Sequence, residues 1–361
     1  MKIKRLRSGV LLLLLWQLSG CDDSPKNPES FAGLGSEAAE FTPVVPGKTL
    51  SFPADHGPHE GFRIEWWYIT ANLKDAQGRS FGVQWTLFRN ALKAGPEQPG
   101  WGSQTVWLGH AAVTSATRHY AAERYARGGV GQAGVTGAPF SAWIDDWSFS
   151  SQSNPANPLA DMQLHARGQG FSYQLRLTSS KPLVLQGEQG YSQKSEHGQA
   201  SYYYSQPFFQ AQGSLEIDGQ SYQVSGPAWL DREWSSQPLT ADQTGWDWFS
   251  LHLDNAEQVM LFRVREKDGS AYLTGTWIAA DGRTELLSRD DISLTPLDST
   301  AVAGRQMPTR WSIKIPGKGL DITAQALNPQ AWMALRIAYW EGPVQLSGSH
   351  TGSGYLEMTG Y

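Results

Sequence analysis

The stretch WWYITANL at residues 66–73 has a second version later in the chain, WDWFSLHL at residues 246–253. After a polar turn, each is followed by a strand-like segment that ends in Leu-Phe-Arg, at residues 87–89 and 261–263. A repeat of this kind indicates two related β domains with a junction near residues 228–240. Chance similarity between two hairpins is the alternative explanation.

Working outward from these stretches, hydrophobic and polar residues alternate along much of the chain. Residues 171–177 show this period of two, which is typical of strands with one buried face. Asp218-Gly219 separates two such runs and predicts a hairpin with a two-residue turn. Helix-period segments are scarce, and Ser115–Arg127 is the best candidate. The pattern predicts an all-β fold of sandwiches or barrels.

Length and composition agree with two β domains. The 361 residues include 16 Trp, 13 Tyr, 13 Phe and 38 Gly, which indicates a large aromatic interior and many tight turns. The part after the leader exceeds one ordinary domain. We therefore expect an N-terminal domain at residues 49–232 and a C-terminal domain at residues 233–361.

The first 21 residues look like the signal of a bacterial lipoprotein. Residues 2–7 carry four positive charges, residues 10–16 are apolar, and Leu-Ser-Gly-Cys at residues 18–21 resembles a lipobox. We predict a signal peptide at residues 1–20 and acylation of Cys21, which would anchor the chain to a membrane. An ordinary cleaved signal is the alternative. Cys21 is the single cysteine, so a disulfide within the chain is excluded.

The residues after Cys21 predict a tethered protein in the cell envelope. Residues 21–48 are rich in Pro, Ser, Gly and acids and are typical of a flexible tether. Asp22-Asp23 resembles an inner-membrane retention signal, so we expect the periplasmic side of the inner rather than the outer membrane. Loss of the four leader charges moves the net charge from −5 to −9, which argues against nucleic acid as a partner.

Three short motifs resemble catalytic or binding signatures but lack the context that such sites need. Gly78–Gly82 matches G-x-S-x-G inside a polar hairpin turn, whereas a nucleophile elbow lies between a strand and a helix. Gly129–Gly134 matches G-x-G-x-x-G without a surrounding βαβ unit. His56 and His59 have no evident third metal ligand. We therefore predict no metal and no cofactor.

Carboxylates and tryptophans are concentrated in three segments, residues 59–68, 229–234 and 245–248. Because alternate residues of a strand share a face, Glu65 should point with Trp67, and Asp247 should point away from Trp246 and Trp248. The candidate acids or bases are Asp231, Glu233, Asp247 and Glu65. The candidate ligand-binding residues are His59, Trp66, Trp67, Tyr68, Arg89, Tyr203, Trp234, Trp246 and Trp248.

A carboxyl buried among indole rings has two possible roles. It can pair with Arg63, Arg89 or Arg232 and act as a structural clamp at the end of a barrel. It can instead stay protonated with a raised pKa and donate a proton. Such an acid could protonate an alkene, the resulting carbocation would be stabilised by tryptophan faces, and water would add to it. The sequence leaves both roles open.

The same segments resemble the two-domain lipocalin-like family of hydroxyneurosporene synthase (carotenoid 1,2-hydratase) and the secreted AttH-like bacterial proteins. The matching stretches run through most of the chain in the family's order: FPADHGPHEGFRIEWWYITANL (52–73), FGVQWTLFR (81–89), LGHAAV (108–113), SYYYSQP (201–207), AWLDREWSSQPL (228–239), GWDWFSLHL (245–253), YWEGPVQLSG (339–348) and GYLEMTGY (354–361). The resemblance implies two lipocalin-like antiparallel β-barrels packed together. The lipobox places the chain closer to the secreted branch.

Three functions follow as alternatives. The first is a membrane-tethered protein that binds a hydrophobic lipid, prenyl or carotenoid-like ligand, with an ABC-transporter permease as a partner, since the resemblance implies such a neighbour. The second is a cofactor-independent hydratase similar to carotenoid 1,2-hydratase. The third is a secreted hydrolase of lipids or esters, which only the resemblance supports.

Overall fold

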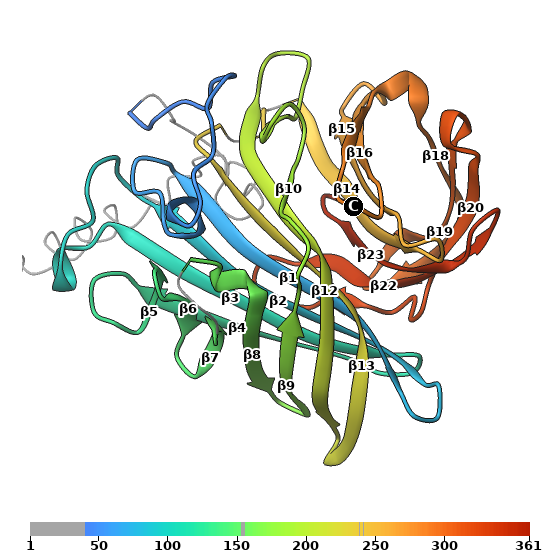
Figure 1. The fold of residues 1–361 in the computed structure, drawn as a ribbon, viewed down its shortest axis with the longest axis horizontal. Coiled ribbons are helices and arrows are strands. Elements are labelled where there is room, and N and C mark those ends of the chain that lie inside the picture. The colour runs from blue at the N-terminus through green and yellow to red at the C-terminus, as the bar shows by residue number, and fades with distance from the viewer. Residues whose placement is uncertain (1–39, 153–155, 238, 241) are drawn as a thin grey trace, which may run out of the picture.

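The computed structural model describes residues 40–152, 156–237, 239–240 and 242–361. Within these residues the chain forms antiparallel strands, and the helices are 3₁₀ turns of three residues. The predicted all-β class is confirmed: two antiparallel sheets curl into barrel or half-barrel shapes that pack side by side (Figure 1). The predicted signal peptide (1–20), Cys21 and the first part of the tether lie outside the described residues.

The first sheet has the order β4-β3-β2-β1-β13-β12-β9-β8-β7-β6-β5, and β10 and β11 add to β12. Its strands are β1 (Ile64–Asp75), β2 (Ser80–Ala91), β3 (Thr105–Ser115), β4 (His119–Arg127), β5 (Ala133–Gly137), β6 (Phe140–Ile144), β7 (Trp147–Ser151), β8 (Asp161–Gly168), β9 (Phe171–Thr178), β10 (Val184–Leu185), β11 (Tyr191–Gln193), β12 (Ala200–Ile217) and β13 (Gln220–Ser235).

The second sheet has the order β17-β16-β15-β14-β23-β22-β20-β19-β18, and β21 adds to β22. Its strands are β14 (Gln243–Leu253), β15 (Gln258–Glu266), β16 (Ala271–Ile278), β17 (Thr284–Leu287), β18 (Ser293–Val302), β19 (Arg305–Ile315), β20 (Leu320–Ala326), β21 (Trp332–Met333), β22 (Tyr339–Gly348) and β23 (Gly352–Met358). The chain thus changes sheets between Ser235 and Gln243, so the domain boundary expected at 232/233 falls inside β13.

The two versions of the repeated stretch occupy equivalent places in the two sheets. β1 lies between β2 and β13, and β14 lies between β15 and β23. In the first sheet Glu65 is opposite Arg89, and in the second Asp247 is opposite Arg263. The two repeated hairpins therefore place a carboxylate and an arginine side by side in each barrel.

The hairpin predicted at Asp218-Gly219 joins the two longest strands. Asp218 and Gly219 have φ values of 52° and 78°, and Ile217 is opposite Gln220. Positive φ at both turn residues is the geometry of a type I′ turn, which Asp-Gly adopts readily. This turn fixes the register of β12 on β13 as far as Phe209, and an irregularity between Gln206 and Phe209 then shifts the register by one residue, which places Tyr203 opposite Glu233.

The helix predicted at Ser115–Arg127 is wrong. β3 ends at Ser115, and His119–Arg127 forms β4, which pairs with β3 from Val106 to Thr114. The alanine-rich, charged composition of this segment favours a helix locally. Pairing with β3 along the whole strand stabilises the extended backbone, and this tertiary context overrides the local preference.

Some strands are buried on both faces, and this pattern positions the site. β9 alternates buried and exposed residues, whereas Ile64–Leu73 of β1 is covered on almost every side chain. One face of β1 packs in the first barrel with Trp67, and the other packs with Trp66 and Tyr68 toward the second barrel. β1, β12 and β13 cross the middle of the molecule beside β22 and β23 (Figure 1). The interface between the barrels is therefore lined by the Trp-rich strands.

Candidate functional site

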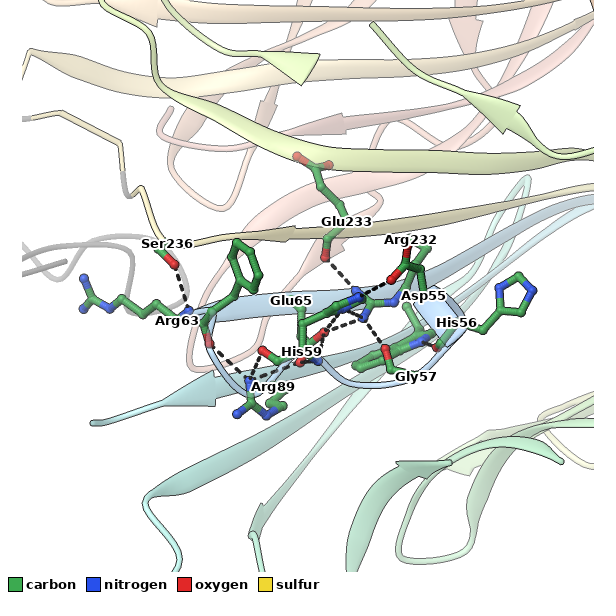
Figure 2. Close-up of polar contacts among 12 residues, drawn as sticks. Asp55, His56, Gly57, His59, Arg63, Glu65, Arg89, Arg232, Glu233 and Ser236 are labelled. Carbon is green, nitrogen blue, oxygen red and sulfur yellow. Dashed lines mark hydrogen bonds and ion pairs between the residues drawn. The ribbon is translucent and has the colours of Figure 1, made fainter. Parts of the chain in front are cut away.

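The inner face of β1 carries the first of two carboxylate clamps. Glu65 is fully buried and accepts hydrogen bonds from Arg89 Nη1 at 3.1 Å and from Arg232 Nη2. The main-chain N–H of His59 donates to both carboxylate oxygens of Glu65, at 3.0 and 3.1 Å. Figure 2 shows these side chains converging on Glu65 from the loop before β1, from β2 and from β13. We call Glu65, Arg89, Arg232 and His59 the first clamp.

Aromatic rings and a second carboxylate complete the first clamp. The guanidinium of Arg232 lies 3.9 Å from the ring centre of Trp67, and His59 stacks on Trp234 at 4.0 Å. The Nε2 atom of His59 is 3.1 Å from Asp55 Oδ1. Burial acts to raise the pKa of Glu65, but Arg232, the hydrogen bond with His59, and Arg89 outweigh it and hold this pKa well below its usual range. Glu65 is therefore an ionised structural anchor.

The second barrel contains an equivalent clamp around Asp247 on β14. Arg263 Nε donates to Asp247 Oδ2 at 2.7 Å, and Arg265 Nη1 donates to Oδ1 at 2.6 Å. The hydroxyl of Tyr361 donates to the same Oδ1 at 2.8 Å. We call Asp247, Arg263 and Arg265 the second clamp. Asp247 is fully buried and points away from Trp246 and Trp248, as the strand alternation predicted.

The opposite faces of the same strands enclose a cavity between the barrels, which we call the inter-barrel pocket. The cavity has a volume of about 100 Å³, which is enough for several water molecules or for one end of an organic ligand. Its lining is largely apolar, and its aromatic, acidic and basic members are Trp66, Tyr68, Phe88, Trp246, Trp248, Phe262, Asp231, Glu233, Glu357 and Lys194.

Asp231 on β13 is the most enclosed acid of the pocket. Its Oδ1 accepts hydrogen bonds from Ser205 Oγ at 2.5 Å and Trp229 Nε1 at 2.6 Å, and its Oδ2 accepts one from Tyr203 at 2.5 Å. Burial raises the pKa of Asp231 to about 7, because it outweighs these three hydrogen bonds, and the nearby charge of Glu233 adds to the increase. Asp231 thus exchanges protons near neutral pH.

Glu357 on β23 reaches the pocket from the second barrel. Trp246 Nε1 donates to its Oε1 at 2.6 Å, and the side chain keeps partial exposure. Burial within the interface raises the pKa of Glu357 to about 7, against the hydrogen bond of Trp246 and with the help of Asp231 and Glu233. Two acids from different barrels therefore titrate in the same range and face the same pocket.

Glu233 lies two residues after Asp231 on the same face of β13. Its Oε1 is 3.0 Å from Lys194 Nζ, and its main-chain oxygen accepts a hydrogen bond from Arg232 Nη1 at 3.0 Å. Figure 2 shows the carboxylate of Glu233 directed away from the first clamp. The backbone of Glu233 thus contacts the first clamp, and its side chain lines the pocket.

A fourth acid, Glu341 on β22, lies opposite Glu357 of β23 and in contact with the pocket residue Tyr68. It is buried, and the hydroxyl of Tyr68 on β1 donates to its Oε1 across the interface. Burial, together with the charge of Glu357, raises the pKa of Glu341 well above its usual range. A neutral Glu341 in contact with Tyr68 joins the two barrels by a hydrogen bond rather than by an ion pair.

The structure divides the predicted site residues between these places. Asp231 and Glu233 face the pocket with Trp66, Tyr68, Trp246 and Trp248, and Tyr203 contacts both Asp231 and Trp248. Glu65, Asp247, His59, Arg89, Trp67 and Trp234 lie inside the barrels, in or against the clamps. The surroundings of these six residues fit the structural-clamp role, which is one of the two roles that the sequence left open.

Glu357, Glu341 and Lys194 were not predicted as site residues. Glu357 and Glu341 lie in stretches that carried the family resemblance, and Glu357 belongs to the same period-two pattern as Tyr355, so the sequence indicated that Glu357 lies in a strand. The sequence did not show which face of β22 and β23 meets the first barrel. Lys194 follows the short strand β11 and had no motif around it.

The other motifs have ordinary surroundings. Gly78 and Arg79 lie in the turn before β2, and Gly129–Gly131 lies in the loop between β4 and β5, as their contexts predicted. Among the described residues, no group of three or more His, Cys, Asp or Glu side chains is placed to hold a metal ion. No helix within the described ranges is long and apolar enough to cross a bilayer.

Comparisons with known proteins agree with this architecture. A family model described as AttH-like matches residues 43–361. The crystal structure of an AttH protein from Nitrosomonas europaea is 33% identical, covers 89% of this chain and 100% of its own, and has a TM-score of 0.78. No curated protein sequence shows a significant match.

Two more distant structures share the fold. Kievitone hydratase from Nectria haematococca is 16% identical, with coverages of 90% and 96% and a TM-score of 0.64. CghA, solved with Sch210972, is 13% identical, with coverages of 92% and 97% and a TM-score of 0.58. At these identities the likeness concerns the fold alone.

Proposed function

This chain belongs to the AttH-like family, as its sequence resemblance predicted, and on that premise we propose that its inter-barrel pocket hydrates a carbon–carbon double bond of an apolar ligand by acid catalysis. The observation that carries the proposal is the pair Asp231 and Glu357: two carboxyls with pKa values of about 7 that face one aromatic cavity. An acid with a pKa near the working pH can both give and recover a proton.

The proposed reaction has two steps. The protonated carboxyl of Asp231 gives its proton to one alkene carbon, and the π electrons form the new C–H bond, which leaves a carbocation on the other carbon. Aromatic faces such as those of Trp66 and Trp248 stabilise positive charge. Water then adds its oxygen to the carbocation while the carboxylate of Glu357 takes a proton from it. Transfer of that proton back to Asp231 through the cavity restores the starting state, and the product is an alcohol.

The fold comparison supports this proposal by analogy. A protein named kievitone hydratase has the same overall architecture, so the fold accommodates a hydratase in at least one case. Fold alone does not fix a reaction. Support specific to this chain comes from the pocket itself, where acids with raised pKa values can donate a proton and aromatic faces can stabilise the carbocation that a protonated double bond forms.

The test uses isotopic water. We expect the full-length protein, incubated in H₂¹⁸O with a panel of prenylated phenols and linear polyenes, to form ¹⁸O-labelled alcohols that mass spectrometry detects. Asp231→Asn and Glu357→Gln should each abolish the product. Asp298→Asn, at an exposed ion pair with Arg310, is the matched control and should keep it. Labelled product that persists in both pocket variants would refute the proposal.

Ligand binding without turnover is the second candidate. It is favoured by the three hydrogen bonds that Asp231 accepts, since a carboxyl with so many donors is also suited to a structural role. Native mass spectrometry of protein purified from its own host separates the two candidates. A carrier would retain a ligand whose mass stays unchanged after prolonged incubation, whereas a hydratase would add the mass of one water.

We also propose an envelope location, in which acylated Cys21 holds the barrels on the periplasmic side of the membrane, within reach of a transporter permease. Its support is the lipobox-like sequence and the single cysteine. Cys21→Ala should move the exported protein from the membrane fraction to the soluble fraction. A variant that stays in the membrane pellet would contradict this location.

A further inference from the structure

The wall of the inter-barrel pocket includes one positively charged side chain, that of Lys194. The ammonium of Lys194 is 3.0 Å from Glu233 Oε1, 4.8 Å from the ring centre of Tyr203 and 4.4 Å from that of Phe262. The Lys194 side chain is only 14% exposed. A desolvated ammonium persists in such a place because a carboxylate and aromatic faces together replace its water. This wall is therefore complementary to positive charge.

The neighbouring part of the pocket is also built from aromatic rings and a carboxyl group. Trp66, Trp246 and Trp248 surround it, and Glu357 enters from β23. Among the described residues that line the pocket, Lys194 alone is basic, whereas Asp231, Glu233 and Glu357 are acidic. When Asp231 and Glu357 are ionised along with Glu233, one lysine cannot balance the three acids, and the pocket then has an excess of negative charge that a ligand could offset.

We propose that this tryptophan-lined part of the pocket binds a lipophilic ammonium, tertiary or quaternary, with its positive head beside Glu357 and its alkyl chain on the apolar wall. The inference rests on the proposed function, because it concerns the same pocket and the same positive charge that a protonated alkene would develop. It extends that function by naming a stable ligand class. A trimethylammonium head is compatible with a cavity of about 100 Å³.

Binding of this cation should depend on pH. The titratable groups that line the pocket around its position are Tyr68 of β1, Lys194 after β11, Asp231 and Glu233 of β13 and Glu357 of β23. Behind them, Tyr203 of β12 contacts Asp231, and Glu341 of β22 contacts Tyr68. Of these, Asp231 and Glu357 lose their protons as the pH rises through about 7. Their ionised forms attract the ammonium, so its affinity should increase from pH 6 to pH 8.

Isothermal titration calorimetry on the full-length protein tests the inference with three probes of equal chain length: hexyltrimethylammonium, 1-hexanol and hexanoate. At pH 8 we expect the ammonium to bind about tenfold more tightly than the alcohol, and hexanoate to bind most weakly. Glu357→Gln and Trp248→Leu should each remove most of that preference. Trp101→Leu, at a 78% exposed tryptophan outside the pocket, should preserve it. Equal binding of the three probes, or tightest binding of hexanoate, would overturn the inference.

The two proposals fail separately. Preferential ammonium binding without any labelled alcohol would overturn the hydratase and keep the cation site. Labelled alcohol together with indifferent probe binding would do the reverse. Circular dichroism of each variant confirms that a lost signal reflects the pocket rather than unfolding.

Discussion

The carboxyls of the two clamps and those of the inter-barrel pocket lie on neighbouring, paired strands but meet different partners. Glu65 and Asp247 each meet two arginines inside a barrel. Asp231 and Glu357 point to the other side and meet hydroxyl, indole and carboxyl groups. Burial acts to raise the pKa of Glu65, Asp231 and Glu357 alike, but only Glu65 has arginine partners, and they hold its pKa below the usual range.

This difference shows that strand alternation sorts one set of residue types into two roles. Arg232 and Glu233 are consecutive, yet Arg232 holds the first clamp and Glu233 faces the pocket. Because side chains alternate along β13, a motif with both charges serves the barrel interior and the interface at once. The acidic residues of such a motif therefore do not all belong to one site.

The largest effect should come from the first clamp. Glu65→Gln leaves Arg232 and Arg89 buried without their anion, and we expect a loss of about 3–5 kcal/mol in the free energy of unfolding. Urea denaturation measures it. Arg232→Gln in the Glu65→Gln background removes one uncompensated charge and should recover part of the loss. A Glu65→Gln protein as stable as the wild type would contradict the structural role.

Asp247→Asn should destabilise less. Its partners Arg263 and Arg265 are each 16% exposed, so water can partly solvate them once the carboxylate is gone. We expect a loss of about 2–3 kcal/mol, below that of Glu65→Gln. Thermal melts of the two variants side by side check this order, and the reverse order would mean that burial of the arginines does not set the cost.

The pocket acids should control how stability changes with pH. The folded pKa values of Asp231 and Glu357, about 7, lie above the ordinary values of 3.8 and 4.5. Between about pH 4 and 7 the folded state retains protons that the unfolded state has released, so stability should fall as the pH rises through this window. The double variant Asp231→Asn, Glu357→Gln should flatten that slope in urea titrations at pH 5 to 8.

The first clamp supplies the contrast for that experiment. Since the pKa of Glu65 is lowered, its contribution is present above about pH 4.5 and is lost only as the pH falls below that value. Glu65→Gln should therefore lower stability at every pH between 5 and 8 without changing the slope. A pH slope that changes in Glu65→Gln but not in the pocket double variant would mean that the clamp, and not the pocket acids, sets the pH dependence of stability in this range.

The smallest effect should come from Tyr68→Phe. This change removes the hydroxyl that donates to Glu341 across the interface and keeps the ring that packs edge-on against Trp248. A neutral hydrogen bond of this kind is worth about 1 kcal/mol, so we expect a loss of that size. Differential scanning calorimetry can resolve it, and a loss as large as that of Glu65→Gln would mean that Glu341 is charged.

Local sequence rules predicted the strands and the Asp218-Gly219 turn, because period-two patterning and turn chemistry act over a few residues. They failed at Ser115–Arg127, where pairing with β3 outweighs helix propensity. They located Asp231 and Glu233 but not Glu357, which lies more than a hundred residues away on the other barrel. Packing of one barrel on the other brings these acids together, and a single strand's pattern does not encode it.

The most direct test of the central claim is infrared difference spectroscopy of the carboxyl C=O stretch between pH 5 and pH 9. We predict a protonated-carboxyl band that disappears with a midpoint near pH 7 and that weakens in Asp231→Asn and again in Glu357→Gln, while Glu65→Gln leaves it unchanged. Absence of a titrating band in this range, or its loss in Glu65→Gln, would contradict the division between structural clamps and a proton-exchanging pocket.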